Sequence, residues 1–216
     1  MSFRREGELM MRPPIVGVVG GGTASPEVYA FAVALGGLLA RGGALVLCGG
    51  RSGVMEGAAR GAREAGGRTI GILPMREGES RGNPYLDCEI YTGLGDARNY
   101  VNAQTSDALI ALEGEAGTLS EIALAVKLRV PVVYLRSWRF LHDQPAFRES
   151  YAETPEEAVE TAFRRIGYRP GASFDQPLRY PLLQDQSRQR EELEAFLKSE
   201  RRVQGPTRKS AQEKDG

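Results

Sequence analysis

A glycine-containing turn and a nearby carboxylate lie within residues 113–121, which read Glu-Gly-Glu-Ala-Gly-Thr-Leu-Ser-Glu. A mostly apolar run over 107–112 precedes the turn, and a helical pattern over 119–128 follows it. A turn between a buried strand and a helix presents unpaired backbone N–H groups at the positive end of the helix dipole, a favourable place for phosphate. We therefore predict that this turn binds phosphate and that Glu121 lies close enough to act on the bound molecule. The predicted phosphate-binding residues are Gly114, Glu115, Ala116, Gly117 and Thr118.

Glu121 also has a structural interpretation. Thr118-Leu-Ser-Glu121 has the form of a capping box, in which Thr118 caps the helix and Glu121 reaches back to the backbone N–H of Thr118. A carboxylate at a helix start still faces the ligand crevice, so the two roles do not exclude each other.

Two further glycine turns follow apolar runs. The run 15–19 leads into Gly20, Gly21, Gly22 and Thr23, after which Ser25 is a predicted N-cap, Pro26 suits the first helical position and Glu27 suits the first turn. The run 44–48 leads into Gly49, Gly50, Arg51, Ser52 and Gly53, and a helix is expected from Val54. The carboxyl ends of parallel strands share one edge of a sheet, so we predict that all three turns line one ligand-binding crevice.

An arginine at the start of another expected helix is the second candidate for chemistry. In Gly95-Asp-Ala-Arg98-Asn99 we expect Asp96 to cap the helix and Arg98 to reach over the crevice, where its guanidinium could bind a phosphate or carboxylate. The alternative is a solvated helix arginine. Arg51 and Ser52 are further candidate anion ligands.

Several classes of site and location are disfavoured by composition. His142 is the one histidine, so neither a serine–histidine–acid triad nor a histidine-based metal site is indicated, and Cys48 and Cys88 have no metal-ligand spacing. Lys plus Arg equals Asp plus Glu, 28 each, which argues against a broad nucleic-acid-binding surface. No run is long enough to span a membrane and the N-terminus lacks a signal-peptide core, so we expect a cytoplasmic protein without membrane or nucleic-acid partners.

Strand and helix patterns alternate along most of the chain. This order predicts a doubly wound, mostly parallel α/β sheet of Rossmann-like type in a single domain. Expected strands cover 15–19, 44–48, 68–73, 89–91, 108–112 and 130–135, and expected helices cover 26–41, 54–65, 96–105, 118–128 and 155–166.

The expected domain is bounded by two less regular parts. We expect a flexible N-terminus over 1–13, the nucleotide-binding domain over 14–167, an extended strap and helix over 168–203, and a disordered tail over 204–216. The helix at 184–202 could pack a narrow apolar stripe on a neighbour or be fully solvated.

The motifs together resemble one family. Gly49-Gly-Arg-Ser-Gly-Val-Met55 resembles the GGxxGxM turn, and Gly117-Thr-Leu-Ser-Glu121 resembles the end of PGGxGTxxE. Both mark the Lonely Guy-like group of Rossmann-type proteins, once labelled "possible lysine decarboxylases". The resemblance covers about residues 14–166, and Gly20-Gly-Gly-Thr23 with Asp96-Ala-Arg-Asn99 is closest to the branch that holds the molybdenum-cofactor carrier proteins.

In Lonely Guy enzymes an arginine and the motif glutamate hydrolyse the N-glycosidic bond of a nucleoside 5′-monophosphate. The resemblance places these catalytic roles on Arg98 and Glu121 and implies a homodimer or higher homo-oligomer. This chain departs from the pattern at Glu113, where the motif has proline, at Glu115, where it has glycine, and at Asn99, where the hydrolases have lysine. A carboxylate at 115 repels a phosphate by about 1 kcal/mol or more. We also expect the missing glycine to close a backbone conformation that the turn needs. No lysine stands in a pyridoxal-phosphate context, so lysine decarboxylation is not expected.

Three functions follow from these observations. The first is a carrier or binding protein, similar to molybdenum-cofactor carriers, for a phosphorylated nucleotide-like molecule. The alternative is a nucleoside 5′-monophosphate phosphoribohydrolase, and a second alternative is a nucleotide-sensing regulatory protein whose C-terminal helix engages a partner. We expect that no cofactor is required and that the ligand, a nucleoside monophosphate or the molybdenum cofactor, binds at the three turns with Asn99 beside them.

Overall fold

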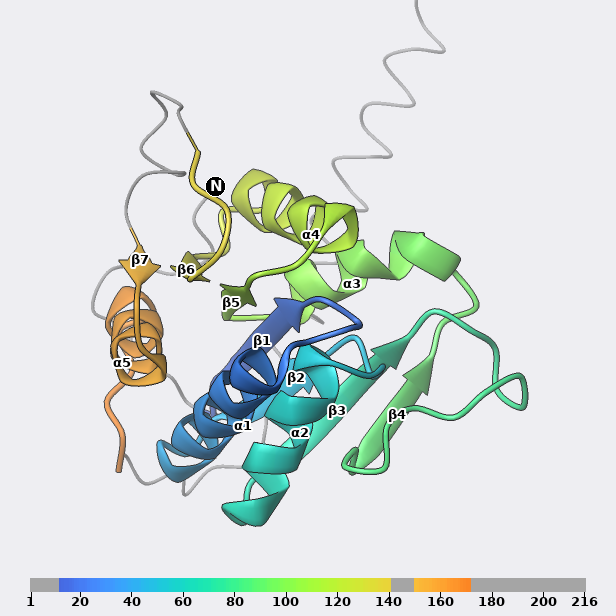
Figure 1. Cartoon of the computed structure of the whole chain (residues 1–216), viewed down its shortest axis with the longest axis horizontal. Coiled ribbons are helices and arrows are strands. Elements are labelled where there is room, and N and C mark those ends of the chain that lie inside the picture. The colour runs from blue at the N-terminus through green and yellow to red at the C-terminus, as the bar shows by residue number, and fades with distance from the viewer. Residues whose placement is uncertain (1–11, 141–149, 172–216) are drawn as a thin grey trace, which may run out of the picture. The chain divides into compact units, whose positions relative to one another are not determined.

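The computed structural model describes residues 12–140 and 150–171. These residues form a parallel sheet of seven strands in the order β4-β3-β2-β1-β5-β6-β7 (Figure 1). The strands are β1 (Ile15–Gly20), β2 (Leu45–Cys48), β3 (Arg68–Leu73), β4 (Cys88–Tyr91), β5 (Ala108–Leu112), β6 (Val132–Leu135) and β7 (Tyr151–Ala152). The helices are α1 (Pro26–Arg41), α2 (Val54–Glu64), α3 (Arg98–Thr105), α4 (Ala116–Lys127) and α5 (Pro155–Arg165), with a 3-10 turn at Gly95–Ala97. The predicted doubly wound α/β fold is confirmed.

Helices cover both faces of the sheet, as continuous apolar strands require. Helices α1, α2 and α5 bury their apolar residues in one core with side chains such as Val16 and Ile110. Helices α3 and α4 form the core of the opposite face with Leu109 and Tyr134. The alternation of Leu109 and Ile110 between the two cores follows from the two-residue period of a strand.

Glycines let α1 and α2 pack closely. A Cβ atom on Gly36 of α1 would lie 2.0 Å from the carbonyl oxygen of Ala58, and one on Gly61 of α2 would lie 1.9 Å from that of Val33. Backbone therefore meets backbone between these helices, which holds the start of α2 next to the end of β1.

Helix caps agree with the sequence at α1 and disagree at α3 and α4. Ser25 Oγ accepts a hydrogen bond from Val28 N at 3.2 Å, as expected of an N-cap. The predicted capping box at Thr118 is wrong, because α4 begins two residues earlier with Glu115 as its N-cap and Thr118 is buried within the first turn. The predicted cap at Asp96 is also wrong, since Asp96 lies inside the 3-10 turn and Ala97 precedes α3.

Residues near the end of the described range extend the core. Tyr168 packs edge-on against Phe163 with ring centroids 4.9 Å apart, and its hydroxyl donates to the carbonyl of Gly42 at 2.8 Å. Strand β7, which the sequence analysis did not predict, has only two residues. The expected strap and helix beyond residue 171, the tail at 204–216, His142 and residues 1–11 lie outside the described residues. Of the helices that are described, none combines the length and apolar character that a membrane span requires.

Candidate ligand-binding site

The three glycine turns lie side by side at the carboxyl edge of the sheet. The amide of Val54 donates to the carbonyl of Gly21 at 3.0 Å, and Ser52 Oγ donates to the carbonyl of Gly22 at 2.7 Å. On the other side, a Cβ atom on Gly21 would lie 3.9 Å from Cα of Gly114. The turn after β1 therefore joins the turns after β2 and β5, as the parallel topology predicts.

Two of these glycines have backbone conformations that other residues rarely adopt. Gly53 has φ of 68°, and a Cβ atom there would lie 2.3 Å from the carbonyl oxygen of Gly21. Gly114 has φ of 101°, and a Cβ atom there would lie 2.2 Å from Oγ1 of Thr118. A side chain at either position would separate the turns from each other or from α4.

The starts of the three helices at this edge differ in how their backbone amides are used. Ser25 caps α1, and the first amide of α2, that of Val54, is bonded to Gly21. The N-cap of α4 is Glu115, whose side chain makes no capping hydrogen bond. A Cβ atom on Gly117 would meet nothing within 4 Å, so the start of α4 faces open space. Of these three helix starts, that of α4 best suits an anion.

Arg98 and Glu121 meet beneath the turns. Arg98 Nη1 lies 3.3 Å from Glu121 Oε1, and Asn102 Nδ2 donates to the same oxygen at 2.7 Å. The guanidinium lies against the second turn, since a Cβ atom on Gly49 would be 2.3 Å from Arg98 Nη1. Arg98 is thus a buried residue of the site, and the alternative of a solvated helix arginine is wrong.

Burial governs the electrostatics of this pair. It raises the pKa of the Glu121 carboxyl above its ordinary value, against the opposing hydrogen bond from Asn102 and the charge of Arg98. It lowers the pKa of the Arg98 guanidinium, which still remains charged at neutral pH because the ordinary value is so high. The hydrogen bonds from Arg98 and Asn102 both end at Oε1 of Glu121.

Asn99 connects α3 to the start of α4. Its Nδ2 donates to Ser120 Oγ at 2.8 Å and approaches the carbonyl of Gly117 at 3.5 Å. Asn99 is buried, so it supports the first turn of α4 from below. Glu113 and Glu115 are exposed at the same turn, and Glu113 has φ of 48°.

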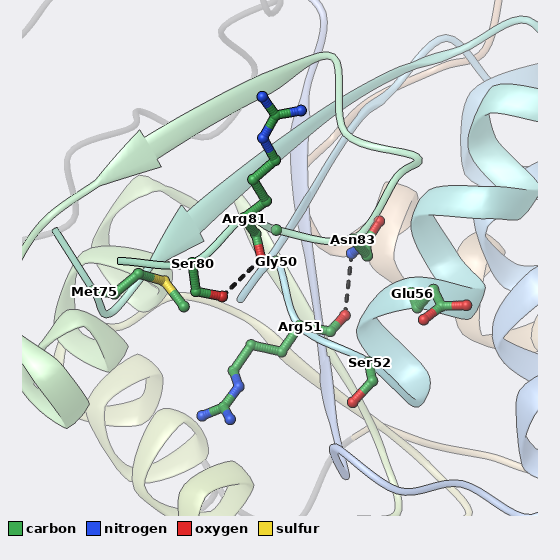
Figure 2. A pocket seen from close by; sticks show the side chains of 9 residues that line it. Gly50, Arg51, Ser52, Glu56, Met75, Ser80, Arg81 and Asn83 are labelled. Atoms are coloured by element: carbon green, nitrogen blue, oxygen red, sulfur yellow. Dashed lines mark hydrogen bonds between the residues drawn. The ribbon is translucent and has the colours of Figure 1, made fainter. Parts of the chain in front are cut away.

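A cavity of about 240 Å³ adjoins the second turn (Figure 2). Its other wall is the segment after β3, which the sequence analysis did not include among the site residues. Asn102 was also missed, although its position four residues after Arg98 places both on one face of α3. The cavity is lined by Gly50, Arg51, Ser52, Glu56, Met75, Ser80, Arg81, Gly82 and Asn83.

Cys48 is not a nucleophile at this edge. The thiol is fully buried at the end of β2, where burial raises its pKa to about 11, and it accepts a hydrogen bond from Gly50 N at 3.4 Å. Among the described residues, no group of three His, Cys, Asp or Glu side chains is placed to hold a metal ion.

Known proteins match most of this chain. An uncharacterized protein of Archaeoglobus fulgidus is 40% identical over 144 residues, which are 67% of this chain and 91% of the relative. The molybdenum cofactor binding protein from Rippkaea orientalis superposes with a TM-score of 0.65 at 40% identity, over 73% of this chain and 99% of that one. The molybdenum cofactor carrier protein of Chlamydomonas reinhardtii superposes with a TM-score of 0.65 at 37% identity, over 72% of this chain and 99% of that one.

A more distant likeness concerns the fold alone. DNA processing protein A from Helicobacter pylori has a TM-score of 0.55 at 19% identity. The resemblance to the Lonely Guy-like group, and within it to the molybdenum cofactor carriers, is confirmed by the family and structural matches. The sequence model of the SLOG cluster4 family matches residues 13–162, and the chain belongs to that family.

Proposed function

We propose that this protein binds a phosphorylated, nucleotide-like small molecule and acts as a carrier or binding protein. The observation that carries this proposal is the uncapped start of α4 beside the other two glycine turns. First-turn amides and the helix dipole favour a phosphate there. The solved relatives whose names refer to molybdenum cofactor binding or carriage support a binding role.

The phosphate is expected at the amides of Ala116, Gly117 and Thr118. Ala116 and Gly117 are exposed, so a ligand can approach them directly. The buried guanidinium of Arg98 contributes positive charge from below, although Glu121 offsets part of it. The exposed Glu115 opposes binding, so we expect moderate affinity for simple phosphates.

The molybdenum cofactor, a phosphorylated pterin, is one candidate cargo. The helix start fits its phosphate, whereas Cys48 is buried and the described residues offer no three-ligand metal group. We therefore expect this chain to hold such a cargo through its phosphate and organic part. A nucleoside monophosphate presents the same phosphate chemistry.

The test is thermal unfolding with nucleoside monophosphates and with the molybdenum cofactor. A ligand at 100 times its dissociation constant stabilises the fold by about 2.7 kcal/mol. Gly117→Asp places a carboxylate in the open space at the start of α4 and is expected to abolish this stabilisation. Ala123→Asp, an exposed change further along the same helix, is the matched control. Equal stabilisation of Gly117→Asp and wild type would exclude the α4 site.

A second candidate function is hydrolysis of a nucleoside 5′-monophosphate at its N-glycosidic bond. The observation in its favour is that Arg98 and Glu121 meet at 3.3 Å beside the turns. Glu121 could direct a water or stabilise the charge that develops on the sugar as the base leaves. Chromatographic detection of free base distinguishes the two functions. Release of base by wild type, and its loss in Glu121→Gln, supports hydrolysis. Absence of release from any common nucleoside monophosphate supports a carrier.

The remaining expectations stay predictions. The helix at 184–202 on which the regulatory alternative depends lies outside the described residues. We also propose a cytoplasmic homo-oligomer without nucleic-acid partners, which light scattering and an electrophoretic shift assay can test.

A further inference from the structure

The cavity beside the second turn is separate from the start of α4. It lies between residues 50–52 and the segment 80–83 after β3 (Figure 2). Strand β1 stands between β2 and β5. Because neighbouring strands are about 4.8 Å apart, the turn after β2 lies roughly 10 Å from the turn after β5. A ligand that reaches both is longer than inorganic phosphate.

The cavity wall is held in place by hydrogen bonds from a buried asparagine. Asn83 N donates to the carbonyl of Gly50 at 2.9 Å, and Asn83 Nδ2 donates to the carbonyl of Arg51 at 3.1 Å. Asn83 Oδ1 accepts from Tyr85 N at 3.2 Å. Since the side chain is occupied at both ends, Asn83 acts as scaffold and the cavity is preformed.

The lining favours a ring system over a second phosphate. Arg51 and Arg81 extend away from each other in Figure 2, so they do not form a clamp for one anion. Glu56 adds a negative charge at the edge of the cavity, where its Oε1 accepts a hydrogen bond from the Tyr29 hydroxyl at 3.2 Å, and this charge repels a phosphate. Met75 offers a polarisable thioether and Arg51 a planar guanidinium, both of which pack well on aromatic faces.

The cavity is sized for part of a ligand. Its volume of about 240 Å³ is below the roughly 300–1,000 Å³ of pockets that hold whole drug-sized molecules. The turn at Gly21 and Gly22 connects it to the start of α4, since both neighbouring turns contact this segment.

We propose that this cavity is a subsite for the planar nitrogen heterocycle of the ligand whose phosphate binds at α4. The inference rests on the proposed binding function and adds where specificity arises: Arg51 and Met75 pack on the ring, and the start of α4 binds the phosphate.

The experiment uses isothermal titration calorimetry to compare adenosine 5′-monophosphate with ribose 5-phosphate, which has the same sugar phosphate but a hydroxyl in place of the heterocycle. Ser80→Trp fills the cavity from its exposed rim. We expect this variant to weaken binding of the nucleotide at least tenfold and to change the affinity for ribose 5-phosphate less than twofold. Glu77→Trp, which places the same ring on an exposed residue of the same loop outside the lining, is expected to bind both probes like wild type.

Each outcome has a distinct meaning. If Ser80→Trp, with wild-type thermal stability, binds the nucleotide as wild type does, the subsite is refuted and the proposed function stands. Equal weakening of both probes shows that the cavity holds the phosphate instead and also refutes the subsite. If wild type binds neither probe nor a pterin phosphate, the proposed function itself fails. A Ser80→Trp protein that unfolds early is replaced by Met75→Trp, judged by the same two affinities.

Discussion

At the scale of single residues, the buried triplet of Arg98, Asn102 and Glu121 is the most constrained part of the site. Each ion of the pair is nearly excluded from water, with side-chain exposures of 10% and 8%. A buried pair costs desolvation to form, but removal of one partner leaves the other charge uncompensated. Neither Arg98 Nε nor Asn102 Oδ1 has a hydrogen-bond partner among the described residues, so the triplet is not fully satisfied.

Arg98→Met is expected to lower the free energy of unfolding by about 3–5 kcal/mol at neutral pH, because it leaves Glu121 buried without its cation. Burial already raises the pKa of Glu121, and loss of Arg98 removes one of the effects that oppose this rise. Between its unfolded-state pKa and its raised folded-state pKa, such a carboxyl binds more protons in the folded protein than in the unfolded protein. Stability is therefore lost as pH rises through this interval and regained as pH falls. The decrease in unfolding free energy caused by Arg98→Met should therefore be smaller at acidic pH than at neutral pH.

Urea unfolding at the two pH values measures this effect. The matched control is the double variant Arg98→Met with Glu121→Gln, in which no charge is left unpaired. We expect it to be more stable at neutral pH than Arg98→Met alone. A double variant as unstable as the sum of its single changes would show that the ion pair is not the cause.

Glu115 is the residue that weakens the phosphate site. Its φ is −111°, which any residue can adopt. Replacing Glu115 with the glycine of the family motif therefore changes the charge of the turn and does not relieve backbone strain. Glu115→Gln is expected to tighten binding of a nucleoside monophosphate by about fivefold at low salt, equivalent to about 1 kcal/mol. Glu115→Gly should do the same, and the gain should shrink as salt is raised.

Titration of both variants at low and high salt checks this prediction. Glu160→Gln, which removes an exposed carboxylate from the middle of α5, is the control for net charge. Unchanged affinity at low salt would mean that Glu115 does not face the bound phosphate.

At the scale of elements, the glycine contact between α1 and α2 positions the second turn. Gly36→Ala is expected to destabilise the protein by several kcal/mol, since its methyl group would overlap the backbone of Ala58. Gly117→Ala is the control, because its Cβ atom meets nothing within 4 Å. There the gain in helix propensity should leave stability unchanged or raise it by up to about 1 kcal/mol. Thermal unfolding of both variants measures the difference, and similar midpoints would contradict the close packing.

At the scale of the whole molecule, the described core ends with Tyr168 and not with α5. Deletion of residues 184–216 is therefore expected to leave cooperative unfolding intact. Deletion from residue 168 onward removes the Tyr168 contacts with Phe163 and Gly42 and should lower the thermal midpoint. Calorimetry of the two truncated proteins checks this; loss of cooperativity in the shorter deletion would show that residues 184–216 belong to the fold.

Local signals in the sequence were sufficient to predict every described helix and every described strand except β7, the parallel sheet, and the edge at which the glycine turns meet. Apolar periodicity, helix-stopping glycines and the Ser25 cap are local signals, and parallel topology brings strand ends together without further information. Most strand and helix bounds were predicted within two residues for this reason. The family likeness also followed from local motifs.

The roles of the side chains in the site depend on tertiary packing. The local pattern of Thr118 and Glu121 matched a capping box, but burial and contacts with Arg98 and Asn102, 23 and 19 residues away in sequence, gave Glu121 a different role. The cavity likewise depends on Asn83 reaching a turn 32 residues earlier. Such contacts depend on how helices and loops pack across the sheet. This packing leaves no periodic pattern in the sequence, so it could not be predicted from the sequence.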